Sequence, residues 1–299
     1  MYHNPVMLEE CMKGLNIKPD GLYVDVTFGG GGHSRRILEQ LDGGHLYAFD
    51  QDADAAKNAF DDPRFTFIPQ NFRYLKNFVQ LHARSKVDGI LADLGVSSYQ
   101  FDTPEKGFST RFEGRLDMRM NQNAPVDAAN IVNSYEVGSL ASVFSRYGEL
   151  KNALALARDI DNARSIRPLE TTTDLKEAVA PHLQKGAENK MLAQVFQALR
   201  IEVNKEMEVL EAFLAQCADV LKPGGRLVVM SYHSLEDRLV KNFMRSGNAS
   251  GEVEKDFFGN QLTPYLLITH KPIVPTDEEL AANSRARSAK LRVAERRDV

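Results

Sequence analysis

Short apolar runs alternate with amphipathic segments along the first hundred residues of the chain. The apolar runs predict buried strands, and the segments between them, with apolar residues at helical spacing, predict helices. Strands that alternate with helices are typical of a parallel sheet with right-handed crossovers. The predicted strands are 22–27, 45–50, 64–69 and 88–93, and the predicted helices are 34–41, 53–60 and 72–83.

The alternation stops near Thr103, and no convincing strand follows before Arg200. Helices are predicted instead, including one N-capped by Thr173 and one long amphipathic stretch over 192–221 that ends in a Lys-Pro-Gly-Gly breaker. The pattern therefore predicts one α/β domain (1–103 and 203–299) with an all-helical insertion (104–202). The other predicted elements are helices at 128–135, 137–144, 150–162, 173–179 and 234–244, a strand at 226–231, and a hairpin around 265–269.

Composition is that of an ordinary globular chain, with 43% hydrophobic and 26% charged residues in 299. No apolar run approaches the ~20 residues that span a membrane, and the N-terminus does not resemble a signal peptide. Two cysteines, Cys11 and Cys217, indicate a reducing compartment and support a disulfide only weakly. No His/Cys cluster has metal-ligand spacing, so we expect a cytoplasmic protein without a metal.

The formal net charge of −4 argues against a globally basic nucleic-acid binder. Positive charge is nevertheless concentrated in places: Arg111, Arg115 and Arg119 recur every four residues. A phosphate-binding patch and a solvated charged face are both open for such groups. The C-terminal segment is similar, with Arg285, Arg287, Lys290, Arg292, Arg296 and Arg297.

Four consecutive glycines, Gly29–Gly32, lie between the first predicted strand and the helix opened by Ser34. Glycine backbone can approach a ligand closely, and the N–H groups of a helix start can face it. The run lacks the Gly-Lys-Ser/Thr of a P-loop and fits the dinucleotide fingerprint only loosely. Asp50, at the end of the next strand, stands where such domains hold ribose hydroxyls, although it could also cap a helix. Together they predict a nucleoside-cofactor pocket.

Two more strand ends carry polar groups. Asp93 closes the fourth predicted strand, before the Gly95 and Ser97 loop, and His233 closes the fifth. Ligands of open α/β sheets bind beyond the carboxyl ends of strands, which favours both as site residues. A turn aspartate and a capping histidine are the structural alternatives.

With these residues assembled, the chain resembles the bacterial 16S ribosomal RNA (cytosine-N4)-methyltransferase family over nearly its whole length. The resemblance depends on seven motifs in order: His3-Asn-Pro5-Val-Met-Leu8, Asp25-Val-Thr-Phe-Gly29-Gly-Gly-Gly-His33-Ser34, Asp93-Leu-Gly-Val-Ser-Ser98, Leu116-Asp-Met-Arg-Met120, Phe196-Gln-Ala-Leu-Arg200-Ile-Glu-Val-Asn204, Ser231-Tyr-His-Ser-Leu-Glu-Asp-Arg238 and Ser284-Arg-Ala-Arg-Ser-Ala-Lys-Leu-Arg-Val-Ala-Glu-Arg296.

The resemblance implies a Rossmann-like class I methyltransferase domain with an inserted helical domain. It implies S-adenosylmethionine as methyl donor and the exocyclic N4 of a cytidine in the decoding region of 16S rRNA as acceptor. The residues implied in donor binding are Gly31, Gly32 and His33, then Asp50 on the ribose, Phe72 against the adenine, and Asp93 with Gln100.

Two departures fall in the insertion and concern RNA contacts more than the donor. Gly114-Arg115 replaces the family's usual Gly-Pro, and Lys190-Met-Leu-Ala-Gln194 replaces a basic His-Pro-Ala-Thr-Arg segment.

Methylation of cytosine N4 needs hydrogen-bond acceptors, because the lone pair of N4 is delocalised into the ring. We consider Asp93, Ser97 and His233 as catalytic candidates, with a donor-binding role equally supported for Asp93. On the long helix a polar stripe lies beside the apolar one, and we expect it to face RNA together with Arg111, Arg115 and Arg119, unless it is a solvated face. The stripe consists of Gln197, Arg200 and Asn204.

Two other functions stay open: an amino-methyltransferase acting on DNA or a small molecule, and a non-catalytic nucleoside-binding or ribosome-assembly factor. The sequence does not give the oligomeric state, a homodimer included, or the identity of the proton acceptor. The acidic net charge favours an assembled small subunit over naked RNA as substrate.

Overall fold

The structure is a computed structural model that describes residues 5–183 and 185–298. The chain forms two compact units. Unit 1 consists of Met1–Gly95 and Met207–Val299, and unit 2 of Val96–Glu206. The boundaries expected from the sequence, at 103/104 and 202/203, stay a prediction about domains that fold independently. His3 and Asn4 of the first family motif lie outside the described residues.

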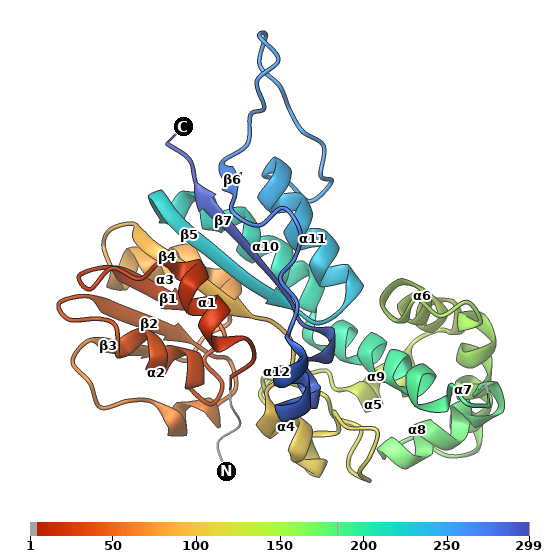
Figure 1. The fold of residues 1–299 in the computed structure, drawn as a ribbon. Helices are drawn as coiled ribbons and strands as arrows, with labels where there is room; N and C mark the ends of the chain where they lie inside the picture. The colour runs from red at the N-terminus through yellow and green to blue at the C-terminus, as the bar shows by residue number, and fades with distance from the viewer. Residues whose placement is uncertain (1–4, 184, 299) are drawn as a thin grey trace. The chain divides into compact units, whose positions relative to one another are not determined.

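Unit 1 is built on a seven-stranded sheet in the order β3-β2-β1-β4-β5-β7-β6 (Figure 1). The first five strands in that order run parallel, and β7 is antiparallel to both β5 and β6. This arrangement confirms the predicted Rossmann-like α/β class. The strands are β1 (Leu22–Asp25), β2 (His45–Phe49), β3 (Phe65–Ile68), β4 (Val87–Asp93), β5 (Leu221–Ser231), β6 (Tyr265–Leu267) and β7 (Lys290–Arg296).

Both faces of this sheet are covered by helices. Alternating residues of β1 enter different cores: Tyr23 packs with helices α1 and α2, and Val24 packs with helices α3, α10 and α11. Period-two alternation of strand side chains explains this division. The helices of unit 1 are α1 (Leu8–Leu15), α2 (Gly32–Leu38), α3 (Leu75–His82), α10 (Glu206–Val220), α11 (Ser234–Ser246) and α12 (Asp277–Ala282).

Unit 2 is helical, as the pattern predicted. Among its described residues the β pairing is limited to one isolated bridge, between Arg115 and Thr171. Its helices are α4 (Ser98–Asp102), α5 (Ala128–Ser134), α6 (Val137–Gly148), α7 (Ala153–Ile166), α8 (Thr172–Val179) and α9 (Glu188–Asn204). In the described part of the chain, no helix is both long and apolar enough to cross a membrane.

Three local predictions are wrong. The long amphipathic stretch breaks at Lys205, whose left-handed backbone (φ 51°) separates α9 from α10, because no helix continues through that conformation. The cap of α8 is Thr171, not Thr173, since the Thr171 hydroxyl accepts from the Asp174 N–H. Residues 53–60 contain a short 3₁₀ turn, η1 (Ala55–Asn58), instead of an α-helix.

The C-terminal region also differs from expectation. The strand at Tyr265–Leu267 does not form a local hairpin around 265–269 but pairs with β7, more than twenty residues later. β7 lies within the basic C-terminal segment, so this segment is not a free tail. Arg292 is 6% exposed and donates to Asp237 at 2.7 Å.

Candidate active site

Four polar side chains stand where neighbouring parallel strands of unit 1 end. The pairing of β1 with both β2 and β4, and of β4 with β5, brings these ends to one edge of the sheet. Such an edge is the ligand-binding side of an open α/β sheet. The four residues are Asp25 at the end of β1, Asp50 after β2, Asp93 at the end of β4 and Tyr232 after β5.

Asp25 organises the loop from β1 to α2. Its carboxylate, 1% exposed, accepts from the Ser34 hydroxyl at 2.7 Å and from the Thr27 N–H at 3.0 Å. Burial raises its pKa, and the Ser34 bond opposes the rise. Gly31 caps α2 with φ 77°, and a Cβ there would lie 2.9 Å from a ring carbon of Phe60. This position therefore needs glycine for both its backbone and its space.

Asp50 joins the glycine loop to the end of β2. One carboxylate oxygen accepts from the Gly29 N–H and the other from the Asp52 N–H, each at 2.8 Å. Burial raises the pKa of Asp50 to about 6, against these two bonds. Each oxygen keeps a second lone pair, so the fixed carboxylate suits a vicinal diol such as a ribose.

Phe72 begins the 3₁₀ turn η2 (Phe72–Tyr74), after β3. Its partly buried ring packs edge-on against Phe213, with ring centroids 5.3 Å apart. The preceding Asn71 donates to the side-chain oxygen of Gln51 at 2.7 Å, which ties this turn to the loop that carries Asp50. An aromatic ring is thereby fixed on a turn that is hydrogen-bonded to the loop after Asp50.

Asp93 is held at its backbone and at one oxygen of its carboxylate. Oδ1 accepts from the Tyr232 hydroxyl at 2.7 Å, and its own N–H donates to Thr27 Oγ1 at 2.7 Å. Oδ2 lies 3.8 Å from Nδ1 of His33, whose Nε2 is 3.0 Å from the Val6 carbonyl oxygen. Burial raises the pKa of Asp93 to about 6, although His33 and Tyr232 oppose the rise.

His233 is the N-cap of α11. Its Nδ1 accepts from the Glu236 N–H at 3.4 Å, while Nε2 lies 3.2 Å from Glu236 Oε1 without a hydrogen bond. Its position agrees with the capping alternative, and a catalytic role for His233 stays a prediction.

Ser97 and Gln100 belong to unit 2, where they form a capping box at the N-terminus of α4. The Ser97 hydroxyl accepts from the Gln100 N–H at 3.2 Å, and Gln100 Oε1 accepts from the Ser97 N–H at 3.1 Å. Both side chains thus shape the helix start that follows the β4 loop. Their catalytic and donor-binding roles remain predictions.

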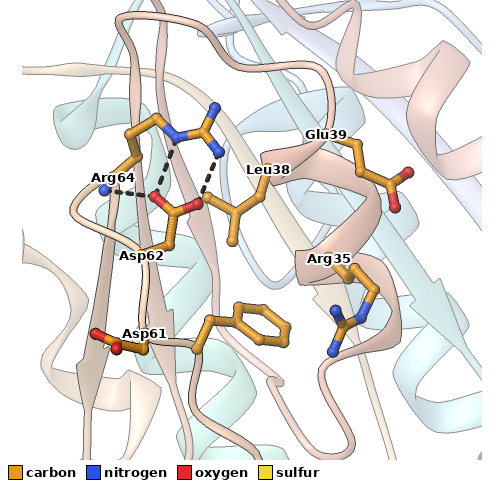
Figure 2. A pocket seen from close by; sticks show the side chains of 7 residues that line it. Arg35, Leu38, Glu39, Asp61, Asp62 and Arg64 are labelled. Atoms are coloured by element: carbon orange, nitrogen blue, oxygen red, sulfur yellow. Dashed lines mark hydrogen bonds and ion pairs between the residues drawn. The ribbon is translucent and has the colours of Figure 1, made fainter.

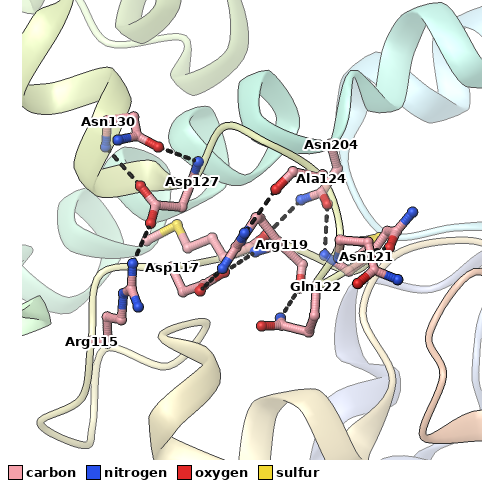
Figure 3. A network of polar contacts seen from close by, with 12 residues as sticks. Arg115, Asp117, Arg119, Asn121, Gln122, Ala124, Asp127, Asn130 and Asn204 are labelled. Atoms are coloured by element: carbon pink, nitrogen blue, oxygen red, sulfur yellow. Dashed lines mark hydrogen bonds and ion pairs between the residues drawn. The ribbon is translucent and has the colours of Figure 1, made fainter.

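The three evenly spaced arginines of unit 2 have different environments, and Figure 3 shows two of them, Arg115 and Arg119. Arg119 is 17% exposed and makes a two-pronged pair with Asp117 at 2.8 and 2.7 Å. Arg115 is 65% exposed and contacts Asp127 at 2.9 Å. Arg111 is exposed, and its guanidinium has no partner among the described residues. Arg111 and Arg115 therefore offer donors that Arg119 does not.

The polar side chains of the α9 stripe bond to other residues of unit 2. Gln197 donates to the Tyr147 carbonyl at 2.9 Å, and Arg200 pairs with Glu206 at 2.8 and 2.9 Å. Asn204 donates to the Met118 carbonyl at 2.7 Å, near Arg119 (Figure 3). RNA contact by these three stripe residues stays a prediction.

A separate hollow in unit 1 contains none of the predicted site residues (Figure 2). It lies between α2 and the segment before β3, and both of its arginines are engaged. Arg64 pairs with Asp62 at 2.7 Å, and the Arg35 guanidinium lies 4.8 Å from the centre of the Phe60 ring. We assign this hollow no role.

Sequence reasoning missed Asp25, Thr27 and Tyr232 as site residues. Asp25 and Thr27 stand inside the glycine motif, at the same strand end that identified the loop, so their position was an available signal. Tyr232 lies next to His233 in the motif after β5. Nothing in the sequence pairs it with Asp93, which is 139 positions away.

Comparison with known proteins agrees with this geometry. Residues 1–297 match the MraW methylase family. A Flavobacterium johnsoniae protein named ribosomal RNA small subunit methyltransferase H is 58% identical, covering 99% of this chain and 98% of that protein. A Parabacteroides distasonis protein of the same name is 59% identical, covering 99% and 97%.

Proposed function

The chain belongs to the MraW methylase family, and we propose that it methylates the exocyclic N4 of a cytidine in the decoding region of 16S rRNA, with S-adenosylmethionine as donor. Membership confirms the family resemblance drawn from the motifs. The observation that carries the proposal is the row of carboxylates Asp25, Asp50 and Asp93 beside a glycine loop, at one edge of a parallel sheet.

The residues present fit this donor. Asp50 offers two fixed oxygens to the ribose hydroxyls, and Phe72 offers a ring for the adenine. The glycine loop turns sharply at Gly31, and Gly30 beside it is exposed with open space at its Cβ position, so that the loop backbone can lie against the methionine portion next to Gly32 and His33. When bound, the donor supplies an electrophilic methyl group. The protein's task is to hold N4 in line with it and to remove a proton.

We assign proton removal to Asp93. A hydrogen bond from the amino group to the carboxylate localises the nitrogen lone pair, and the carboxylate then takes the proton. A pKa near 6 leaves Asp93 mostly ionised at neutral pH, yet makes it a stronger base than an ordinary aspartate. Oδ2 accepts no hydrogen bond from the described residues, and its nearest ionic neighbour, His33 Nδ1, is 3.8 Å away.

Unit 2 is the proposed RNA-binding part. Arg111 and Arg115 are its exposed members of the arginine series, and Phe112 between them is 44% exposed. Phosphate contacts and base stacking by such side chains can offset the few kcal/mol needed to unstack a target base. The acidic net charge favours an assembled small subunit as acceptor, and we place the protein in the cytoplasm accordingly.

The test is methyl transfer from labelled S-adenosylmethionine to small subunits that lack the modification, followed by nucleoside mass analysis. Free 16S rRNA and duplex DNA are run in parallel. N4-methylcytidine in subunit RNA is the expected result. Donor binding without any methylated nucleoside would favour the assembly-factor alternative, and label in DNA alone would overturn the assignment of the acceptor.

A further inference from the structure

We propose that Tyr232 is a positioning residue for the methyl transfer: its hydroxyl holds Oδ1 of Asp93, so that Oδ2 is the oxygen presented to the substrate amino group. This inference rests on the proposed function and adds a residue that the family motifs do not assign to the reaction. The hydroxyl lies 2.7 Å from Oδ1.

Tyr232 is itself fixed at both ends. Its N–H donates at 2.8 Å to Glu236, whose carboxylate is 3% exposed and caps α11. Its ring packs on the core that includes Cys11, and a Cβ on Gly95 would lie 3.5 Å from a ring carbon of Tyr232. The phenol therefore has little freedom, and the direction of its O–H bond determines how the Asp93 carboxylate is oriented.

The direction of donation is also fixed. Burial first, and the nearby charge of Asp93 second, raise the pKa of the Tyr232 phenol well above its ordinary value. The phenol stays protonated throughout the working pH range and acts as donor only. His33, at 3.8 Å from Oδ2, is too far for a hydrogen bond, so it leaves Oδ2 open while adding a favourable field.

The proton balance follows from this geometry. As the N4–carbon bond forms and the carbon–sulfur bond of the donor breaks, N4 loses one proton, which Oδ2 takes. Tyr232 keeps its own proton and stabilises the carboxylate before transfer. The charged or titratable groups around Asp93 that set this balance are Cys11 of α1, Asp25 of β1, His33 of α2, Tyr232 after β5 and Glu236 of α11.

Tyr232→Phe tests the inference, because it removes only the hydroxyl. The hydrogen bond favours the ionised carboxylate, so its loss raises the pKa of Asp93 further. We expect kcat to fall roughly ten- to hundredfold, the range for a hydrogen bond to a charged group. The acid limb of the pH–kcat profile, near 6 in the wild type, moves to higher pH. The dissociation constant of the donor stays unchanged.

A matched control is Tyr265→Phe, since the buried Tyr265 hydroxyl makes no hydrogen bond in the described structure. We expect it to keep the wild-type kcat and pH profile. If Tyr232→Phe folds poorly, 3-fluorotyrosine at position 232 keeps the shape and gives a stronger donor. The acid limb should then move to lower pH, the opposite direction.

The two proposals fail in different ways. Wild-type protein that forms no N4-methylcytidine would refute the proposed function, whatever Tyr232→Phe does. A wild type that methylates subunit RNA, beside a Tyr232→Phe variant with the same kcat and the same acid limb, would refute only the positioning role. An acid limb that does not move with 3-fluorotyrosine would refute it as well.

Discussion

Buried carboxylates occur in both units, but the three at the sheet edge of unit 1 have surroundings opposite to those of Asp117 and Asp174 in unit 2. In unit 1, burial raises the pKa of Asp25, Asp50 and Asp93, because neutral hydrogen-bond donors and a distant imidazole are their main compensation. In unit 2, burial also acts to raise the pKa of Asp117 and Asp174, but bonds to arginine, hydroxyl and backbone groups outweigh it and lower both values.

This difference distinguishes carboxylates that can take part in a reaction from carboxylates that stabilise the fold. A carboxylate with a full arginine partner, such as Asp117 with Arg119, is a poor proton acceptor and a good structural clamp. A carboxylate held by a neutral hydroxyl, such as Asp93, keeps accepting capacity and a pKa near 6. Raised pKa values at one edge of a sheet are therefore an indication of a working site.

The largest effect should come from removing the charge of Asp93 in unit 1. Asp93→Asn keeps an amide oxygen for the Tyr232 hydroxyl but cannot take a proton. We expect single-turnover methyl transfer at saturating donor to fall by roughly 10²- to 10⁴-fold, with no loss of unfolding free energy at pH 7, because a desolvated charge is removed. Full turnover in this variant would show that Asp93 only binds the donor.

In unit 2, removing the arginine that pairs with a buried carboxylate should lower the free energy of unfolding. Arg119→Met leaves Asp117, whose side chain is 5% exposed, without its cation, and we expect a loss of about 3–5 kcal/mol. Arg115→Met is the control, since that guanidinium is 65% exposed and should matter by less than about 1 kcal/mol. Denaturant unfolding measures both, and hydrogen exchange in α5 assigns the loss to unit 2. Equal losses in the two variants would contradict the contrast.

Most of the fold could be predicted from the sequence, because the patterns that indicate strands and helices are local. Apolar runs placed β1 to β4 within a few residues, and the strand ends at Asp50 and Asp93 followed directly from them. Parallel strands share one edge, so residues far apart in sequence could be assigned to one site without coordinates.

Other features depend on partners that local pattern does not show. The helix breaks at Lys205 although the apolar spacing in the sequence continues past it. The basic sequence of β7 does not indicate a buried strand, because the charge of Arg292 is compensated by Asp237, 55 positions away. Arg119 and Arg111 look identical in a sequence, yet Arg119 pairs with Asp117, whereas the Arg111 guanidinium has no partner in the described part of the chain. The hydrogen bond from Tyr232 to Asp93 also joins residues far apart in the sequence, so local pattern does not show it.

Acidification should affect the sheet-edge carboxylates of unit 1 and the arginine-paired carboxylates of unit 2 in opposite directions. Asp50 and Asp93 have pKa values near 6 when folded, above the unfolded value of 3.8, so protonation stabilises unit 1 as pH falls from about 6 towards 4. The lowered pKa values of Asp117 and Asp174 make unit 2 lose stability only as pH falls below 3.8. Hydrogen exchange in β4, corrected for intrinsic rates, should show protection rising from pH 7 to 5. The rise should be smaller in Asp93→Asn, and an identical rise would exclude Asp93 as its source.

The smallest effect concerns Arg111, an exposed guanidinium of unit 2 without a partner among the described residues. Arg111→Ala should weaken binding of small-subunit RNA by several-fold and reduce the slope of log affinity against log salt by about 1, because one phosphate contact is lost. Arg167→Ala is the matched control: that side chain is 62% exposed but is bound to Asp174 at 2.7 Å. It should leave the salt slope unchanged, because its charge is already neutralised inside the unit. Binding isotherms at several salt concentrations decide this, and an equal slope for Arg111→Ala and wild type would remove Arg111 from the RNA-binding face.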